Sequence, residues 1–320
     1  MKKAGFVAAA LAVACLSHEA SASCGAAFCL VNTDWSAQGA WVEPGVRFDL
    51  RFETVTLDQP RSGAERIAVG EVARHHDEVE TRNRNWVANI DWGPGEAWGL
   101  NLSIPYVDRD HTHIHNHRGA KLPETWSFRE IGDVRVQARR ELFASRETPE
   151  HQSSVGVMLG VKLPTGRHDV ANADGDLAER TLQPGTGTTD LLLGVYWHGM
   201  APLADVSWFT RVQGVLPANT RDGYKPGRQV SVDAGARYAL GRDVGLMLQL
   251  NYVAKGRDGG AEAEPEDSGQ RQLFVSPGIS WNLGRSAQLY AYAQFPIRQR
   301  VNGVQLTADW SALAGASWRF

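Results

Sequence analysis

The 320-residue sequence predicts an all-β fold, a transmembrane antiparallel up-and-down β-barrel of about twelve strands with long extracellular loops and short periplasmic turns. Three observations support this prediction. Apolar and polar residues alternate with a period of two in one segment after another. The connections between these segments are alternately short and long, as in outer-membrane barrels. The last alternating segment ends on an aromatic residue, Phe320.

The chain begins with the features of a secretory signal peptide, which we expect over residues 1–22. A positively charged start, an apolar stretch over 5–16 and the small residues Ala20-Ser21-Ala22 follow one another in the required order. The apolar stretch is shorter than the roughly 20 residues that a membrane-spanning helix needs. A lipoprotein with its lipid on Cys15 or Cys24 is the alternative.

Residues 23–45 show no clean alternation, and we expect them to form a periplasmic cap or a short plug of the barrel. Cys24 and Cys29 lie in this segment. Because an exported chain folds in an oxidising compartment, we expect these two cysteines to form a local disulfide. Metal ligation by the pair is the alternative, since four intervening residues also suit a chelate.

The barrel is expected over residues 46–320, and its first strand shows the pattern clearly. Every second residue from Val46 to Phe52 is apolar, and every second residue from Arg47 to Glu53 is charged. In a transmembrane barrel the apolar face meets lipid and the charged face meets a wet lumen. The same alternation predicts further strands over 86–92, 98–106, 134–138, 155–163, 191–197, 204–212, 230–238, 244–252, 273–283, 287–295 and 308–320.

The links between these strands predict how the barrel is oriented. Outer-membrane barrels have short periplasmic turns and long outer loops, so both termini are expected in the periplasm. Outward-facing Trp and Tyr residues gather near both ends of the strands, which indicates the two membrane interfaces. Outer-membrane lipid and, through Phe320, the barrel-assembly machinery are therefore the expected partners. Long links are predicted over 58–82, 107–131, 164–188, 215–228, 254–270 and 298–307.

Composition and motifs exclude several other classes of protein. A helical membrane protein is excluded because no later segment has the 18 or so consecutive apolar residues that it requires. With 33 Lys and Arg against 36 Asp and Glu, the chain lacks the basic surface of a nucleic-acid-binding protein. The four-histidine run carries Thr112 and no serine nucleophile, and an enzyme is not expected. A soluble secreted β-protein is the remaining alternative fold.

The predicted link over 107–131 carries a candidate metal site. If the strand continues past Pro105, four histidines at alternate positions point to one side, and the strand's parity makes that side the lumen. Imidazoles in such number suit Cu, Zn or Ni. The alternative is a solvated polar loop. The candidate ligands are these histidines, two nearby aspartates and two histidines of the first long link: His111, His113, His115, His117, Asp108, Asp110, His75 and His76.

Inward-facing charged side chains form the second candidate site. Basic and acidic residues nearly balance, which argues against a strongly ion-selective pore. One interpretation is a polar conduit, and the other is a set of cross-strand ion pairs that fill a narrow barrel. The residues expected to line the lumen are Arg47, Asp49, Arg51, Glu53, Arg135, Arg139, Asp190, Arg211, Asp233 and Arg237.

Three short motifs carry a resemblance to a known family. They are Ile131-Gly-Asp-Val-Arg-Val136, Val161-Lys-Leu-Pro-Thr-Gly166 and Leu182-Gln-Pro-Gly-Thr-Gly-Thr-Thr-Asp-Leu191. The pattern resembles the outer-membrane barrels associated with meta-pathway phenol degradation, over roughly residues 45–320. That resemblance implies passage of small organic compounds across the outer membrane of a Gram-negative bacterium. The histidine-rich segment and the cysteine pair depart from the family pattern.

Two functions therefore follow from the sequence. The first is an outer-membrane channel or transporter for a small solute such as an organic compound. The alternative is a metal-binding surface barrel that holds Cu, Zn or Ni in its histidine-rich outer segment, with the barrel serving as an anchor. No cofactor other than Cu or Zn is suggested.

Overall fold

The computed structural model describes residues 28, 30–35, 38, 44–72, 77–95, 97–117, 120–145, 152–201 and 204–320, with only the backbone described at positions 116, 117 and 120. The predicted signal peptide, Cys24, Cys29, His75 and His76 lie outside the described residues. Within these ranges, no helix is long and apolar enough to cross a membrane.

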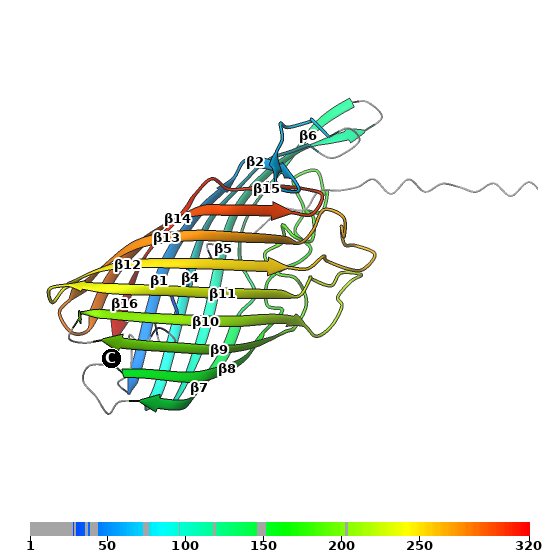
Figure 1. Cartoon of the computed structure of the whole chain (residues 1–320). Helices are drawn as coiled ribbons and strands as arrows, with labels where there is room; N and C mark the ends of the chain where they lie inside the picture. Colours follow the sequence, from blue (N-terminus) through cyan, green and yellow to red (C-terminus); the bar gives the residue numbers. More distant parts are fainter. Residues whose placement is uncertain are drawn as a thin grey trace, which may run out of the picture.

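One antiparallel sheet closes on itself as a barrel (Figure 1). It contains 13 strands, all but β6 belong to the ring, and the pairing of β4 with β5 closes it. The predicted barrel of twelve strands is confirmed. The ring strands are β1 (Gly45–Leu57), β4 (Asp77–Gly95), β5 (Trp98–His117), β7 (Arg135–Ser145), β8 (Gln152–Lys162), β9 (Asp190–Ala201), β10 (Val206–Pro217), β11 (Gln229–Leu240), β12 (Val244–Lys255), β13 (Gln270–Leu283), β14 (Ala287–Val301) and β16 (Ser311–Arg319).

The wall of the barrel is polar inside and apolar outside. In β1, Asp49 and Glu53 are 1% and 0% exposed, whereas the outward-facing Trp92 and Trp98 of β4 and β5 are 50% and 52% exposed. On the inner face of the wall, the hydroxyl of Tyr290 donates to both carboxylate oxygens of Asp49, at 2.9 and 3.0 Å. This inversion of a soluble core is what a strand between lipid and a polar lumen requires.

Part of the predicted long link over 107–131 is strand instead of loop. β5 continues to His117 and pairs with β6 (Ala120–Ile131) in a hairpin that leaves the ring. The prediction ended the strand early because both faces are polar beyond Tyr106 except at Val107 and Ile114, so the apolar alternation that marks a lipid-facing strand disappears. A second small sheet is formed by β2 (Gln59–Ser62), β3 (Glu65–Arg66) and β15 (Val304–Thr307).

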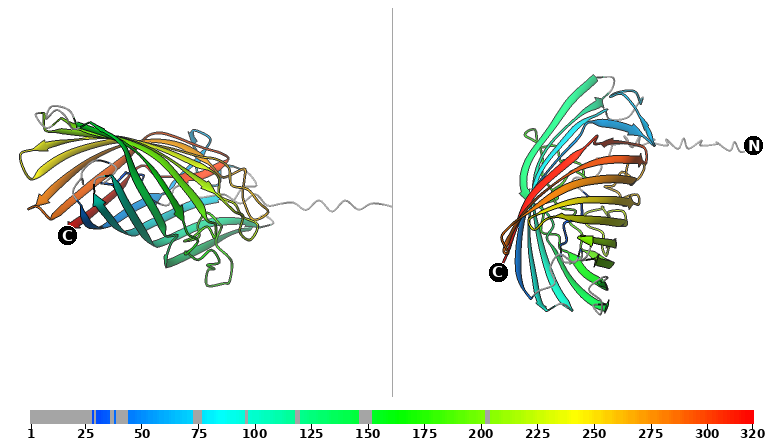
Figure 2. Two further views of the ribbon diagram at one scale, coloured as in Figure 1. Left: turned by 90° about the horizontal axis from the view of Figure 1, so that it is seen from below. Right: turned by 60° about the vertical axis from the view of Figure 1, so that its left-hand side comes forward.

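The two ends of the barrel differ in their connections. Tight links such as Leu240 to Val244 and Leu283 to Ala287 lie at one end, and the C-terminus lies there too (Figure 1). The long connections, with β2, β6 and β15, lie at the opposite end, where Figure 2 shows them extending beyond the ring. We call these the short-turn end and the long-loop end.

A segment near the N-terminus, Leu30 to Trp35, lies inside the barrel. Asn32 exchanges two hydrogen bonds with the side chain of Gln249, at 3.1 Å to its oxygen and 2.9 Å from its nitrogen. Trp35 packs edge-on against Tyr290 with ring centroids 4.9 Å apart. These contacts form a floor across the lumen, which we call the lumen segment.

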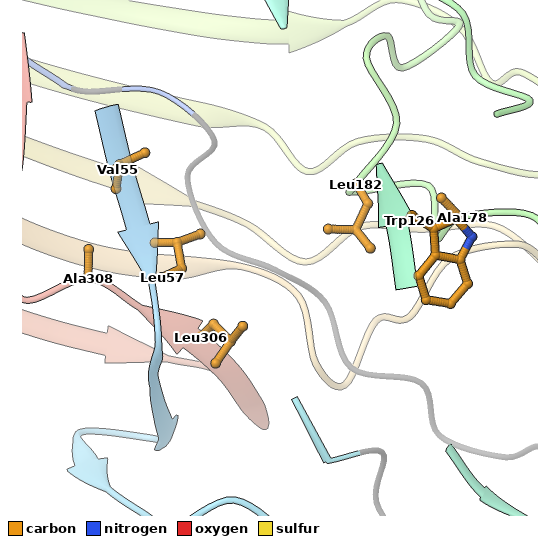
Figure 3. Close-up of a cluster of buried hydrophobic side chains, with 7 residues drawn as sticks. All are labelled: Val55, Leu57, Trp126, Ala178, Leu182, Leu306 and Ala308. Atoms are coloured by element: carbon orange, nitrogen blue, oxygen red, sulfur yellow. The ribbon is translucent and has the colours of Figure 1, made fainter. Parts of the chain in front are cut away.

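A cluster of buried apolar side chains fastens the long loops to the inside of the wall (Figure 3). The inward positions of β1 become apolar at its end, at Val55 and Leu57, and they pack with residues of β6 and of two long connections. The connection between β8 and β9, residues 163–189, is thereby folded over the long-loop end of the lumen. The other members of the cluster are Trp126, Ala178, Leu182, Leu306 and Ala308.

Candidate functional site

The three family-like motifs meet around one buried carboxylate, Asp133. Its oxygens accept hydrogen bonds from the backbone N–H of Gly166 at 3.1 Å and of Thr186 at 2.9 Å. The ammonium of Lys162 lies 2.7 Å from Asp133 and 3.2 Å from Asp190. Each motif supplies at least one member of this network. The motifs therefore fix how the long β8–β9 connection docks on the wall.

A close approach of two glycines makes this docking possible. A Cβ placed on Gly166 would lie 2.8 Å from the Cα of Gly185, and one on Gly185 would lie 2.6 Å from an oxygen of Asp133. Real Cβ atoms do not come so close to a neighbouring backbone. The glycines of the two motifs are therefore required because the backbones of residues 166 and 185 are in contact.

Next to this network lies a cavity of about 350 Å³, which we call the central cavity. It reaches from Leu30 of the lumen segment to residues 180–186 of the β8–β9 connection. Six basic and two acidic side chains line it, and both acids are paired with Lys162. The basic residues are Arg51, Arg109, Arg135, Lys162, Arg180 and Lys255, and the acidic residues are Asp133 and Asp190.

Arg135 differs from the other cations of the central cavity. Arg51 is paired with Glu53 at 2.6 Å, and Lys255 is paired with Asp258 at 2.7 Å. Among the residues that the structure describes, the guanidinium of Arg135 has no hydrogen bond or ion pair. A guanidinium offers five N–H donors in a planar fork that matches a carboxylate. Arg135 is thus available to a solute.

A second cavity, of about 480 Å³, opens at the short-turn end. Trp35 of the lumen segment lines it, together with the turn around Gly284. The lumen segment therefore separates this cavity from the central cavity. Its charged lining is also mostly basic: Arg47, Arg237, Arg285 and Arg319 against Asp205.

All ten residues predicted to line the lumen lie on the inward side of their strands. Arg47, Glu53 and Asp190 are 4%, 0% and 3% exposed. Arg211 contacts the lumen segment, with its nitrogen 3.6 Å from Asp34. Acidic and basic residues nearly balance over the whole lumen. In the linings of the two cavities basic side chains outnumber acidic ones, and the acidic side chains are largely held in ion pairs.

The histidines of β5 continue the inward row of the strand. His111 and His113 are 1% and 3% exposed, and their facing nitrogens, Nε2 and Nδ1, are 3.3 Å apart. Glu78 of β4 lies with them, and all three ligand atoms are within 4.8 Å of one another. His115, His113 and Glu124 of β6 form an overlapping group by the same measure.

Asp108 and Asp110 do not join the histidines, which corrects their assignment as candidate ligands. The alternation that turns His111 inward turns both aspartates outward. Asp108 pairs with Arg129 at 3.1 Å, and Asp110 accepts a hydrogen bond from Ser127 at 2.6 Å. Both also pair with Arg84.

Apart from Ile114, the outward positions of β5 are polar from Asp108 onward, so this part of the hairpin lies beyond the lipid-facing band. Burial lowers the pKa of the His111 imidazole to about 3, and the neighbouring His113 and Arg109 act in the same direction. Burial raises the pKa of Glu179, in the β8–β9 connection, well above its ordinary value, and Glu264 and Glu78 reinforce the shift. The surroundings of His111 therefore keep its imidazole neutral at physiological pH.

Several residues of these sites were not predicted. Arg109 lies two residues before His111 in β5, so the alternation of the strand alone indicated that its side chain faces the lumen. Glu78 faces inward only because of an irregularity in β4, and Glu179 comes from a connection without periodicity. No sequence signal marked those two glutamates.

The closed sheet, the lipid-facing apolar surface and the charged lumen define a β-barrel of the outer-membrane type. The chain belongs to the family described as "Putative MetA-pathway of phenol degradation", which matches residues 58–310. No curated protein matches the sequence.

Comparison with a solved outer membrane channel shows the same fold. An outer membrane channel from Pseudomonas putida F1 superposes with a TM-score of 0.68 at 10% identity, covering 91% of this chain and 99% of that one. The NanC porin gives a TM-score of 0.46 at 10% identity, covering 85% of this chain and 100% of that one. The KdgM porin in complex with oligogalacturonate gives 0.41 at 10% identity, with coverages of 86% and 99%.

Proposed function

We propose that this protein is an outer-membrane channel for small organic solutes and that its lumen favours anions. The observation that carries the proposal is the central cavity, with six basic and two acidic side chains in a volume of about 350 Å³. Cavities that hold small molecules are commonly about 300–1,000 Å³. Family membership supports an organic solute, and the fold of the Pseudomonas channel supports passage through the barrel.

The preference for anions follows from the arrangement of the charges. Field lines are focused in a narrow lumen with low-dielectric walls, so a local excess of one sign acts strongly on a passing ion. Asp133 and Asp190 share Lys162, and these three groups together carry one negative charge, which Arg109, Arg135 and Arg180 outweigh. Arg135 is left to bind a carboxylate with two parallel hydrogen bonds.

The orientation of the barrel is part of the proposal. The long-loop end faces the outside and the short-turn end faces the periplasm, as connection lengths imply for this class of barrel. Both termini are then periplasmic. Removal of residues 1–22 as a signal peptide and recognition of Phe320 by the assembly machinery belong to the same proposal.

Flux through proteoliposomes tests the function. Benzoate, benzyl alcohol and benzylamine share one aromatic ring and differ in charge, so their relative rates report the preference of the lumen. We expect benzoate to enter fastest and benzylamine slowest, and a salt gradient across a planar bilayer to give an anion-selective reversal potential. The absence of any flux or current would overturn the channel, and a faster flux of benzylamine would overturn the anion preference.

A further inference from the structure

The two buried histidines of β5 are arranged like ligands of a metal ion. His111 Nδ1 lies 2.9 Å from Thr81 Oγ1, and His113 Nε2 lies 3.1 Å from a carboxylate oxygen of Glu124. A carboxylate only accepts, so the proton of neutral His113 is on Nε2 and its Nδ1 presents a lone pair. Metal-binding histidines are usually held in this way by an acceptor on the far ring nitrogen.

The distance between the facing nitrogens, which is also that of a long N–H···N hydrogen bond, matches two ligands of a tetrahedral ion such as Zn²⁺. Two nitrogens bound to tetrahedral Zn²⁺ at 2.0–2.1 Å are separated by about 3.3 Å. Nε2 of His111 and Nδ1 of His113 are 3.3 Å apart. The pair therefore has the separation of two zinc ligands without any movement of the strand.

Two carboxylates complete a set of four ligand atoms. An oxygen of Glu78 lies 3.9 Å from His111 Nε2, and an oxygen of Glu179 lies 3.9 Å from His113 Nδ1. In a tetrahedral zinc site these nitrogen–oxygen separations are about 3.4 Å. For Glu78 the gap is about half an ångström. Glu179 lies outside the group of Glu78, His111 and His113 whose ligand atoms are all within 4.8 Å of one another, so it must rotate further to reach the ion.

Glu78 owes its inward position to a β-bulge. Opposite β5, the register of β4 shifts between Glu78 and Glu80, so Val79 has no partner. Without this extra residue, the regular alternation of β4 would turn the side chain of Glu78 away from Thr81 and His111. Bulges of this kind often re-aim a side chain beside a functional site.

Glu179 is a buried carboxylate that lacks a hydrogen-bond partner. Its side chain is 12% exposed, and within the described part of the chain neither oxygen takes part in a hydrogen bond. Burying a charged group without a partner is costly. Glu264 and Asp267, from the β12–β13 connection, act on it with further negative charge. The surroundings of Glu179 thus favour a cation.

We propose that Glu78, His111, His113 and Glu179 bind one Zn²⁺ at the long-loop end of the lumen, with Thr81 and Glu124 as positioning residues. Zn²⁺ accepts imidazole nitrogens and carboxylate oxygens as ligands, and four protein ligands in a tetrahedral set leave no open position, as in structural zinc sites. Because Glu179 belongs to the β8–β9 connection, the ion fastens that connection to β4 and β5. The same connection supplies Arg180 and Thr186 to the central cavity, so the ion fixes the outer wall of the proposed pathway.

Calorimetric titration of the folded, detergent-solubilised protein with ZnCl₂ tests the site. Wild type is expected to bind one ion per chain. The double variant His111→Ala/His113→Ala loses this binding, Glu179→Gln weakens it at least about tenfold, and Thr81→Ala weakens it about tenfold, as loss of a supporting contact does. His168→Ala is the matched control, because His168 pairs with Asp222 at 2.9 Å outside the cluster.

Circular dichroism and resistance to trypsin verify that each variant is folded. Absence of stoichiometric binding in wild type, or unchanged binding in the folded double variant, overturns the proposal. Substitution with Co²⁺ gives a second measurement, since tetrahedral Co²⁺ absorbs strongly in the visible range and octahedral Co²⁺ only weakly. A weak octahedral spectrum also overturns the closed site. Binding is measured without solute flux, so failure of the zinc site and failure of the channel are distinguishable.

Discussion

The central cavity and the long-loop end of the same lumen carry opposite kinds of charge. Cations dominate in the central cavity, where Arg135 has no partner among the described residues. At the long-loop end, glutamates such as Glu78 and Glu179 surround two neutral imidazoles. A chain with a formal net charge of −3 therefore contains a basic region and an acidic one in series. Local arrangement, and not the total, sets what each region binds.

The two regions also differ in how the chain builds them. Three of the six cations of the central cavity, Arg135, Lys162 and Lys255, are the first or last residues of ring strands. Glu78, His113 and Glu124 belong to strand segments outside the lipid band. Ion pairs in the two regions allow a direct comparison, because the Lys162 pairs are buried and the Arg221–Asp222 pair is exposed.

The largest effect is expected from Lys162→Ala. Lys162 is 6% exposed and lies between two buried aspartates, and removal of one partner from a buried ion pair costs about 3–5 kcal/mol of unfolding free energy. Arg221→Ala is the control at the long-loop end, where Arg221 and Asp222 are 57% and 58% exposed and pair at 3.1 Å. Its effect should stay below about 1 kcal/mol. Urea unfolding in lipid vesicles measures both, and equal losses would contradict the contrast.

Arg135→Glu should have the next largest effect, this time on selectivity. A unit charge at about 4 Å in water is worth about 1 kcal/mol, so reversing one charge shifts the energy of a passing anion by about 2 kcal/mol. The ratio of anion to cation permeability should therefore change at least about tenfold. The reversal potential in a salt gradient measures this ratio. Arg300→Glu makes the same charge change at an exposed, outward-facing position of β14 and should leave the ratio unchanged. A similar change of the permeability ratio in both variants would show that Arg135 does not interact with passing ions.

The barrel wall is predictable from the sequence because the polarity of each side chain matches the medium that it faces. Lipid on one side and a polar lumen on the other produce the alternation from Val46 to Glu53, and every ring strand repeats it. Counting alternate positions along β5 also predicted that the side chains of His111 and His113 point into the lumen, as the structure places them. The same rule places Asp108 and Asp110 outside, although nearness in sequence had suggested that they join the histidines.

The sites depend on contacts that no local pattern encodes. Glu179 meets His113 only because the β8–β9 connection folds back over the lumen, and that docking depends on two glycines nineteen residues apart, Gly166 and Gly185. One unpaired residue, Val79, decides the direction of Glu78. Sequence reasoning counts residues along a regular strand, so it cannot place a side chain that follows a bulge or comes from an irregular connection.

The smallest expected effect concerns the floor of the central cavity. Gln249→Ala removes two hydrogen bonds to Asn32, a net loss of about 1 kcal/mol. A loss of that size raises the population of a displaced lumen segment about fivefold. Single-channel recordings should therefore show brief high-conductance openings about five times as often as in wild type.

Gln272→Ala provides the matched control for this prediction. Gln272 is also buried on the inward face of the wall, but it donates to Gln270 at 2.7 Å, and no hydrogen bond links it to the lumen segment within the described ranges. The frequency of brief high-conductance openings should be the same in this variant as in wild type. If both variants open equally often, the wall itself fluctuates and the lumen segment is not the floor. If only Gln249→Ala opens more often, the central cavity has a movable boundary toward the short-turn end, whereas the proposed zinc site holds its other boundary in place.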